Sequence, residues 1–376
     1  MLMMAMLGCN AAGAEPLPAS GLSVRDFGAL GDGIADDTVA FQAALNAAAD
    51  RGRVVWVPPV GPGLGYVLTG TLRFPEGVAL VGSPWGLGSN VRAVFRPDRS
   101  NVKGAVILAR PSDDEAPPGR KSPLFHVSAG CTLRGLWIFY DQQPMPADET
   151  FSDPASPYYY PSFEAARVGF VKDHVKPYGP TIYSTFCPNL VLEDLICDRY
   201  YDFAYLAGAG KSHLNRVTLH GYRRAISVDH TFDVIHISNI ATVPNVGPQS
   251  PGGPYDGKHY TWAYGAIASS PDNVGVHLGQ ADGYSFADLF FFGIHTAMRL
   301  GRSAEDPLAD PVTGIVPPAA GSGLGPWGST AGFMADQCAV GIHLVWPSPL
   351  SNRISNLLVF PAFADGETFA AVTGSG

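Results

Sequence analysis

A short pattern of apolar and polar residues returns along the chain at a nearly constant interval. Its unit is apolar-x-polar-apolar, and copies begin at Leu192, Leu214 and Ile237, which are 22 and 23 residues apart. Related tetrads begin at Leu133, Phe286 and Ile354. A repeat of this length indicates one supersecondary unit stacked on copies of itself. About 22 residues suits one coil of a parallel β-helix, whereas helical repeats need roughly 33 or more.

A second series has the same period. Short segments with apolar residues at alternate positions end at five sites, which are Leu206, Val228, Leu278, Leu300 and Leu344. The steps between them are 22, 50, 22 and 44 residues, so three are multiples of 22 and the step of 50 leaves room for a loop. Unrelated strands of a β-sandwich would not be expected to share one period. The two series therefore predict an all-β solenoid, a parallel β-helix.

The N-terminal part predicts a helix in front of the first coil. Asp36 or Asp37 is placed to cap it, and its apolar stripe comprises Phe41, Ala44, Leu45 and Ala48. Such a helix would cover the open end of the solenoid. Nothing after the last tetrad resembles a cap, which predicts either a truncated chain or a partner subunit at that end. We therefore expect a monomer or an end-capped homo-oligomer.

Composition narrows the class of protein. The 376 residues include 44 Gly and 33 Pro, as expected for many bends, and residues 21–376 are predicted to form one elongated domain. The net charge of −9 argues against nucleic-acid binding. No apolar run approaches the roughly 18 residues of a membrane span. Residues 1–20 resemble a signal peptide or lipoprotein leader, which predicts a secreted protein, a periplasmic protein or an outer-surface lipoprotein. The five cysteines lack CxxC spacing, so no metal site is predicted.

The stretch from Val24 to Gly82 resembles a known family. It contains F-G-A-x-G-D-G-x-x-D-D-T-x-A-F-Q-A-A followed by a V-x-x-P strand, and it is similar to the N-terminal segment of pectate-lyase-like proteins such as rhamnogalacturonases, alginate epimerases and phage tailspikes. The resemblance implies a right-handed parallel β-helix that acts on or binds polysaccharide, and it implies that the aspartates of this segment are structural. The catalytic motifs of the polygalacturonases and epimerases are absent, so no catalytic residue is carried over.

Three long segments interrupt the repeat, at about 141–180, 244–273 and 303–328. Loops of this kind usually gather on one side of a solenoid and form the wall of a groove. The second segment contains Tyr260 and Trp262, which could bind substrate by stacking on sugar rings. They could equally pack the loop against its own scaffold.

Side chains alternate across a strand, so the residues between the inward apolar positions point outward. These outward residues are Tyr205, Ser227, His277, Arg299 and His343, and Asp229 occupies the next outward position of its coil. Asp229, His277 and Arg299 are predicted to be catalytic, because neighbouring coils lie only about 4.8 Å apart. A carboxylate and an imidazole can exchange protons, and an arginine can hold a carboxylate. Tyr205 and His343 are predicted to bind substrate. The alternative is an ordinary solvated sheet face.

The bends beside these strands add further candidates. Asp202 and Asp282 could each supply a second catalytic carboxylate. Arg224 and His230 belong to a locally basic stretch that begins at Lys211 and would suit a uronate-bearing chain. Taken singly, each of these charges is also what a solvated bend contains.

Three functions remain open from the sequence. A glycoside hydrolase would use Asp229 with Asp202 or Asp282 on either side of the scissile bond. A polysaccharide lyase would use Arg299 or Arg224 to neutralise the uronate carboxylate. In that case His277 or Tyr205 would remove the C5 proton, and only this alternative would involve Ca²⁺. The third function is a tailspike-like binding or fibre protein without chemistry. The hydrolase is the first prediction, with polysaccharide as partner and no cofactor.

Overall fold

A computed structural model of the protein describes residues 21–51, 54–83, 104–111, 121–242, 261–301, 325–345, 352–361 and 370–374. Within these ranges the strands form two sheets, and all strand pairs are parallel. The large sheet contains β1 (Leu22–Ser23), β2 (Val54–Val57), β3 (Tyr66–Leu68), β5 (Ala79–Gly82), β6 (Ala105–Ala109), β8 (Thr132–Arg134), β9 (Leu136–Phe139), β11 (Val191–Tyr200), β13 (His213–Gly221), β15 (Ile235–Thr242), β17 (Tyr284–Phe292), β19 (Gly328–Cys338) and β21 (Asn352–Pro361).

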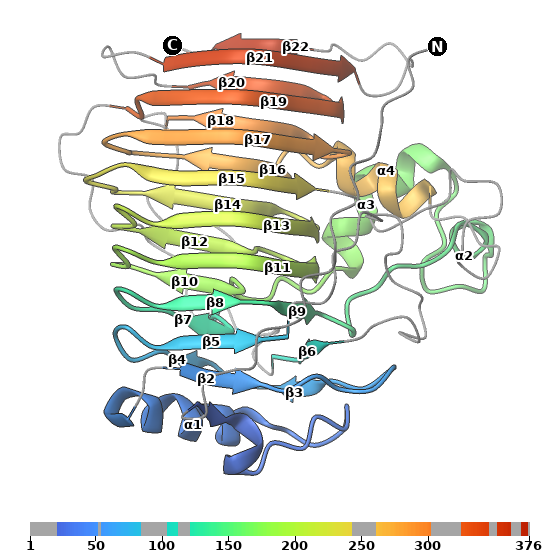
Figure 1. The fold of residues 1–376 in the computed structure, drawn as a ribbon. Helices are drawn as coiled ribbons and strands as arrows, with labels where there is room; N and C mark the ends of the chain where they lie inside the picture. The colour runs from blue at the N-terminus through green and yellow to red at the C-terminus, as the bar shows by residue number, and fades with distance from the viewer. Residues whose placement is uncertain are drawn as a thin grey trace, which may run out of the picture.

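The small sheet alternates with the large one along the chain. It contains β4 (Leu72–Arg73), β7 (Phe125–His126), β10 (Ile182–Ser184), β12 (Ala204–Ala207), β14 (Arg224–Asp229), β16 (Val274–Leu278), β18 (Thr296–Leu300), β20 (Val340–Leu344) and β22 (Ala370–Gly374). From β11 onward each coil contributes one strand to the large sheet and one to the small sheet, whereas the three coils before it contribute two strands each to the large sheet. Figure 1 shows the coils stacked as successive rungs. This arrangement is the predicted parallel β-helix.

The tetrad marks one column of this stack. Leu192 is the register partner of Leu214, and Leu214 is the register partner of Ile237. The first residues of successive tetrads therefore lie directly above one another in the core. The polar third residue is a bend in left-handed conformation, with φ of 53° at Asp194 and at Asn239. Such a conformation is costly for most residues and least costly for Gly, Asn and Asp. The tetrad is therefore the corner at which each large-sheet strand turns.

The second series is also confirmed. Leu206, Val228 and Leu278 are successive register partners, and the column continues through Leu300 and Leu344. The first four of these side chains are at most 1% exposed, and Leu344 packs against the same core. The interior is thus filled by ladders of aliphatic side chains, one from each coil, which fixes the register between coils.

Two helical segments precede the first coils. The 3₁₀ helix η1 spans Val24–Phe27, and α1 spans Thr38–Arg51 at the N-terminal end of the stack (Figure 1). The predicted apolar stripe of α1 is completely buried, with 0% exposure at Phe41, Ala44, Leu45 and Ala48. The packing of this stripe holds α1 against the first strands.

The aspartates before α1 serve the backbone. Asp32 Oδ1 accepts hydrogen bonds from the N–H groups of Ile34 and Ala35, and Asp36 Oδ1 accepts one from Thr38 N at 3.0 Å. Asp37 accepts hydrogen bonds from two earlier backbone N–H groups, so it closes the preceding loop rather than capping the first turn through its side chain. These contacts agree with the structural role that the family resemblance implies.

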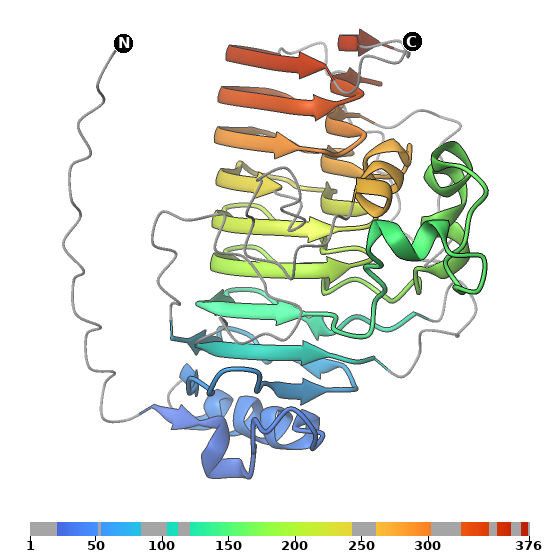
Figure 2. The ribbon, with the colours of Figure 1, turned by 90° about the vertical axis from the view of Figure 1, so that its right-hand side faces the viewer.

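Two of the long segments form helices that pack together. The first contains α2 (Asp148–Ser152) and α3 (Phe163–His174), and the second contains α4 (Thr261–Ser269). Both connect the large sheet to the small sheet, and Figures 1 and 2 show all three helices on one side of the stack. The third segment lies in sequence between β18 of the small sheet and β19 of the large sheet, and most of it lies outside the described residues. No helix in the described ranges is long and apolar enough to cross a membrane.

Candidate functional site

A column of polar side chains runs along the outer face of the small sheet, at one register position of β10, β12, β14, β16, β18 and β20. The register gives its members directly, and we call them the polar column: Tyr183, Tyr205, Ser227, His277, Arg299 and His343. The column contains no acidic residue. Five of its members are partly exposed, whereas the apolar residues before and after them are mostly buried. The outward prediction for Tyr205, His277, Arg299 and His343 is therefore confirmed as geometry.

Aromatic rings form the lower part of the column. The rings of Tyr183 and Tyr205 are stacked, with centroids 5.9 Å apart and planes at 24°. Below them, His126 lies 5.5 Å from Tyr183, and Arg73 Nη1 lies 2.9 Å from His126 Nδ1. Burial lowers the pKa of His126, and the nearby Arg73 lowers it further. Burial raises the pKa of Tyr183. His126 and Tyr183 are therefore neutral near pH 7, and they suit hydrogen bonding and stacking rather than charge recognition.

The basic groups lie higher in the column. His277 and Arg299 are register partners on the adjacent strands β16 and β18, and His343 is the partner of Arg299 on β20. His277 Nε2 lies 3.3 Å from the carbonyl oxygen of Gly301. A neutral imidazole that donates from Nε2 carries its lone pair on Nδ1, where it can accept a proton. An imidazole and a guanidinium therefore lie one strand spacing apart.

Asp229 lies beside the column, but its carboxylate is engaged by the backbone. It is 6% exposed, and its Oδ1 accepts hydrogen bonds from His230 N at 2.9 Å and Gln280 N at 2.8 Å. The carboxylate covers Gly279, where an added Cβ would lie 2.7 Å from Asp229 Cγ. Asp229 is thus on the coil next to His277, as expected, and it holds together the corners of two coils.

Asp202 is placed away from Asp229. Its carboxylate forms a buried two-pronged ion pair with Arg223, whose Nε lies 2.8 Å from Asp202 Oδ1. It also accepts a hydrogen bond from Arg224 N at 3.2 Å. Asp202 precedes β12, whereas Asp229 is the partner of Ala207 at the other end of that strand, five residues or about 16 Å away. The structure does not bring these two carboxylates together.

Asp282 lies around the corner from the small sheet, between β16 and β17. Its Oδ1 accepts a hydrogen bond from the indole Nε1 of Trp327 at 2.8 Å, and its N–H donates to the carbonyl of Thr231. Its exposed carboxylate is therefore held toward the following coil, outside the polar column.

The remaining predicted binding residues fall in different places. His230 follows Asp229, is 5% exposed and has a left-handed backbone with φ of 50°. Arg224 begins β14, half-buried, at the opposite end of that strand. Trp262 packs among the helices, where its ring lies 5.6 Å from Phe151, so it serves the scaffold of its own loop. Tyr260 lies outside the described residues.

At the level of sequence one member of the column, Tyr183, was missed, and another, Ser227, was given no role. Tyr183 lies in Ile182-Tyr183-Ser184, which is 22 residues before Ala204-Tyr205-Leu206, so the period itself could have revealed it. Ser227 appeared as an outward position without a proposed role. Its hydroxyl is buried and has no hydrogen-bond partner.

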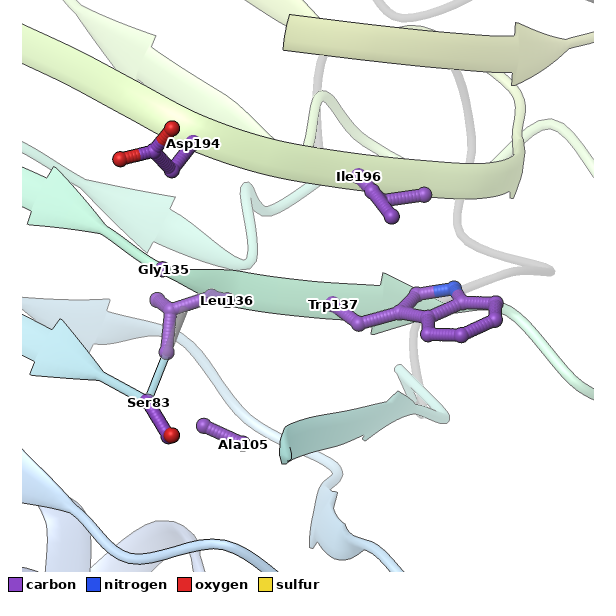
Figure 3. A pocket seen from close by; sticks show the side chains of 7 residues that line it. All are labelled: Ser83, Ala105, Gly135, Leu136, Trp137, Asp194 and Ile196. Atoms are coloured by element: carbon purple, nitrogen blue, oxygen red, sulfur yellow. The ribbon is translucent and has the colours of Figure 1, made fainter. Parts of the chain in front are cut away.

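A pocket on the large sheet offers a comparison (Figure 3). Its lining residues are Ser83, Ala105, Gly135, Leu136, Trp137, Asp194 and Ile196. Asp194 is bound by Arg216, with Nε 2.6 Å from Oδ1, and Figure 3 shows the Asp194 and Trp137 side chains pointing apart. Within the described part of the chain, no group of three or more His, Cys, Asp and Glu side chains could hold a metal ion. The polar column is therefore the candidate site.

The comparisons with known proteins agree with the N-terminal resemblance. A family model described as rhamnogalacturonase A/epimerase, pectate lyase-like, matches residues 21–107. The N-terminal segment is therefore similar to that of pectate-lyase-like proteins. A mannuronan C5-epimerase, AlgE6 of Azotobacter vinelandii, is 39% identical over 88 residues, which are 22% of this chain and 10% of the epimerase. The tail spike protein of Shigella phage Sf6 is 32% identical over 117 residues, which are 31% of this chain and 17% of the tail spike.

A solved structure is similar over most of the chain. The pre-mature gene product 12 of bacteriophage phi29 superimposes with a TM-score of 0.51 and 13% identity, over 89% of this chain and 36% of that protein. At this identity the likeness concerns the fold, which is a right-handed parallel β-helix as predicted. The chain thus spans about a third of that protein, and the sequence matches cover less than a fifth of the two curated relatives.

Proposed function

We propose that the protein acts on a uronate-containing polysaccharide laid along the polar column, and that it cleaves this chain as a polysaccharide lyase. The observation that carries the proposal is the pairing of His277 with Arg299 on adjacent strands. A guanidinium binds a carboxylate with strong charge-assisted hydrogen bonds and stabilises the charge that develops when the neighbouring carbon is deprotonated. The stacked Tyr183 and Tyr205 offer aromatic surface for further sugar residues.

The proposed step is a β-elimination. Nδ1 of His277 accepts the proton from C5 of the uronate, and the electron pair of that C–H bond forms the double bond between C4 and C5. The bond between C4 and the glycosidic oxygen breaks, and the leaving oxygen takes a proton from solvent or from a side chain. Arg299 binds the uronate carboxylate throughout, so that the carbanion-like charge is shared with the guanidinium.

Hydrolysis is less well supported by the carboxylates of the described residues. Glycosidases place two carboxyl groups roughly 5–9.5 Å apart across the scissile bond. Asp202 and Asp229 lie about 16 Å apart along the strand, and Asp202 is committed to Arg223. Asp282 is held by Trp327 at another corner. The geometry therefore favours proton abstraction by an imidazole over acid–base work by a carboxylate pair.

The proposal is tested by incubating the protein with a panel of uronate-containing and neutral polysaccharides. A lyase generates unsaturated ends, which absorb in the ultraviolet, together with an equal number of new reducing ends. Reducing ends without that absorbance would instead identify a hydrolase. Binding without either change would identify a binding protein, and absence of both binding and cleavage would refute the assignment to polysaccharide.

The proposal also includes export from the cytoplasm, which N-terminal sequencing of the mature protein would test.

A further inference from the structure

Gly301 presents its carbonyl group to His277 at the corner that follows β18. His277 Nε2 lies 3.3 Å from this carbonyl oxygen, and because the oxygen can only accept, Nε2 is the donor. The adjacent coils hold the backbone on either side. Gly301 N donates to Leu278 O at 2.7 Å, on the coil below. Leu300 O accepts the N–H of Val345 at 2.8 Å, on the coil above. Between these two anchors Gly301 has a left-handed φ of 93°, which glycine adopts at little cost.

The backbone donor expected for this carbonyl is bound elsewhere. Leu278 and Leu300 are register partners, and Gly301 N continues their parallel ladder. If the ladder went on, the N–H of Gln280 would be the next donor to Gly301 O. Gln280 N instead donates to Asp229 Oδ1 at 2.8 Å. The Asp229 carboxylate thus takes the ladder donor away from the Gly301 carbonyl.

The surroundings of Asp229 hold its carboxylate at this place. The residue is 6% exposed, and its Oδ1 also accepts the N–H of His230 at 2.9 Å. A Cβ added to Gly279 would lie 2.7 Å from Asp229 Cγ, so the glycine leaves the room that the carboxylate fills. A carboxylate that accepts backbone N–H groups forms strong, charge-assisted hydrogen bonds. A continuous set of contacts therefore leads from Asp229 through Gln280 and the coil of Gly301 to His277.

We propose that Asp229 is a positioning residue for His277 and that it acts through the Gly301 carbonyl. Because Asp229 holds the Gln280 N–H, the Gly301 carbonyl stays directed at the imidazole, where it keeps the proton on Nε2 and orients the ring. Nδ1 of the neutral imidazole is then the atom that accepts the C5 proton in the proposed elimination. The proposal rests on the proposed function, and it adds how the base is oriented. It also gives a buried carboxylate a role without contact to the substrate.

Substitutions at Asp229 separate positioning from direct catalysis. Asp229→Asn removes the charge but keeps an oxygen that accepts hydrogen bonds, whereas Asp229→Ala removes the acceptor. Gly301→Ala places a Cβ on a left-handed backbone and should turn the carbonyl away from His277. Asp37→Ala is the matched control. Asp37 is also buried, at 2% exposure, and also accepts two backbone N–H groups, but it lies at the N-terminal end of the stack.

The first measurement is an NMR spectrum of the protein with ¹⁵N-labelled histidine at about pH 8, where an ordinary imidazole is neutral. The signals of His277 are identified by their absence in His277→Gln. In the wild type we expect a single tautomer, with the proton on Nε2. The same tautomer should persist in Asp229→Asn and in Asp37→Ala. A mixture of both tautomers should appear in Asp229→Ala and in Gly301→Ala, because the carbonyl no longer selects one.

The second measurement is the rate of elimination from a polyuronate, followed by the ultraviolet absorbance of the unsaturated ends. Asp229→Ala and Gly301→Ala should lower kcat about tenfold with KM unchanged, as expected when one hydrogen bond that orients the base is lost. Asp229→Asn and Asp37→Ala should keep most of the wild-type kcat. The wild-type spectrum and Asp229→Asn decide the proposal even if Asp229→Ala does not fold.

A mixture of tautomers in the wild type, or a proton on Nδ1, would overturn the positioning role whatever the activity. Loss of activity in Asp229→Asn with the Nε2 tautomer intact would also overturn it, because the charge of the carboxylate itself would then be required. If the Nε2 tautomer depends on Asp229 and Gly301 as expected but the wild type releases no unsaturated ends, the positioning of the imidazole stands and the lyase is refuted.

Discussion

On the large sheet, outward charges lie opposite charges of the other sign, whereas the polar column of the small sheet contains no acidic residue. Arg216 binds Asp194 and also Glu193, with its Nη2 2.8 Å from Glu193 Oε1. Arg134 lies 3.3 Å from Glu193 Oε2 on the neighbouring coil. These side chains neutralise each other across the coils and leave little net charge for a ligand. The column on the small sheet instead presents imidazole, guanidinium and phenol groups in one line.

On a solenoid, the pairing of outward charges distinguishes a candidate binding face from a face that only serves the scaffold. Every coil must place some polar residues outside, so polarity alone does not identify a site. Where acidic and basic side chains alternate on neighbouring coils, they form ion pairs with each other and stabilise the scaffold. Basic side chains in a column without acidic residues take their acidic partners from outside that column. The following predictions test this contrast, beginning with the largest effect.

Replacing His277 with Ala should lower the rate of elimination about 10²–10⁴-fold, the usual contribution of a general base. The matched variant is His213→Ala, which removes an imidazole from the large sheet, where His213 stacks on His236 at 4.7 Å. That variant should cleave at the rate of the wild type. Steady-state kinetics on a polyuronate would measure both, and equal losses in the two variants would erase the distinction between the sheets.

Arg223→Ala should destabilise the fold by about 3–5 kcal/mol, because it leaves the buried Asp202 carboxylate without its partner. Urea unfolding followed by circular dichroism would measure the loss. The single variant Asp202→Asn, made in the wild-type protein, should retain much of the catalytic rate once it has folded. If that variant were stable but inactive, Asp202 would take part in catalysis, and this result would support a hydrolase with a pair of catalytic carboxylates.

Arg299→Ala should weaken the binding of a uronate oligomer about tenfold, as expected for a lost charge-assisted hydrogen bond. Arg134→Ala removes the same side chain from the large sheet, where it is half exposed. It should change affinity little and stability by less than about 1 kcal/mol. Titration calorimetry at low and at moderate salt would compare the two. Similar losses of affinity in both would show that the glycan does not discriminate between the faces.

The smallest effect concerns His126. Its pKa is lowered in the folded state, so the unfolded chain binds more protons below the ordinary histidine value of about 6.5. This contribution therefore destabilises the fold as the pH falls through that value, and it is absent above it. Unfolding free energies measured between about pH 7.5 and about pH 5.5 should fall less in His126→Gln than in the wild type. An identical slope in both would contradict the burial of this ring at the foot of the column.

The tetrad illustrates how far the sequence reaches. The spacing from Leu192 to Leu214 gave the coil length and the register, and the polar third residue coincides with the left-handed bend. One coil escaped the pattern because its tetrad begins with Thr330, which is not apolar, although Gly332 occupies the bend with φ of 70°. The period depends on the same short-range steric requirement in every coil. Each short stretch of sequence therefore contains the pattern, and the pattern can be recognised without knowledge of the three-dimensional structure.

The candidate site divides in the same way. The sequence alone determined the parallel β-helix, its inward ladders and the outward line from Tyr205 to His343, because each follows from the alternation of side chains along a strand and a fixed number of residues per coil. The folded structure was needed to show which carboxylates already have partners within the protein. Asp202 is bound to Arg223, and Asp229 is bound to the backbone of the next coil. These pairings form at corners whose lengths vary from coil to coil, so the repeat in the sequence does not predict them. They depend on where the folded chain brings each side chain.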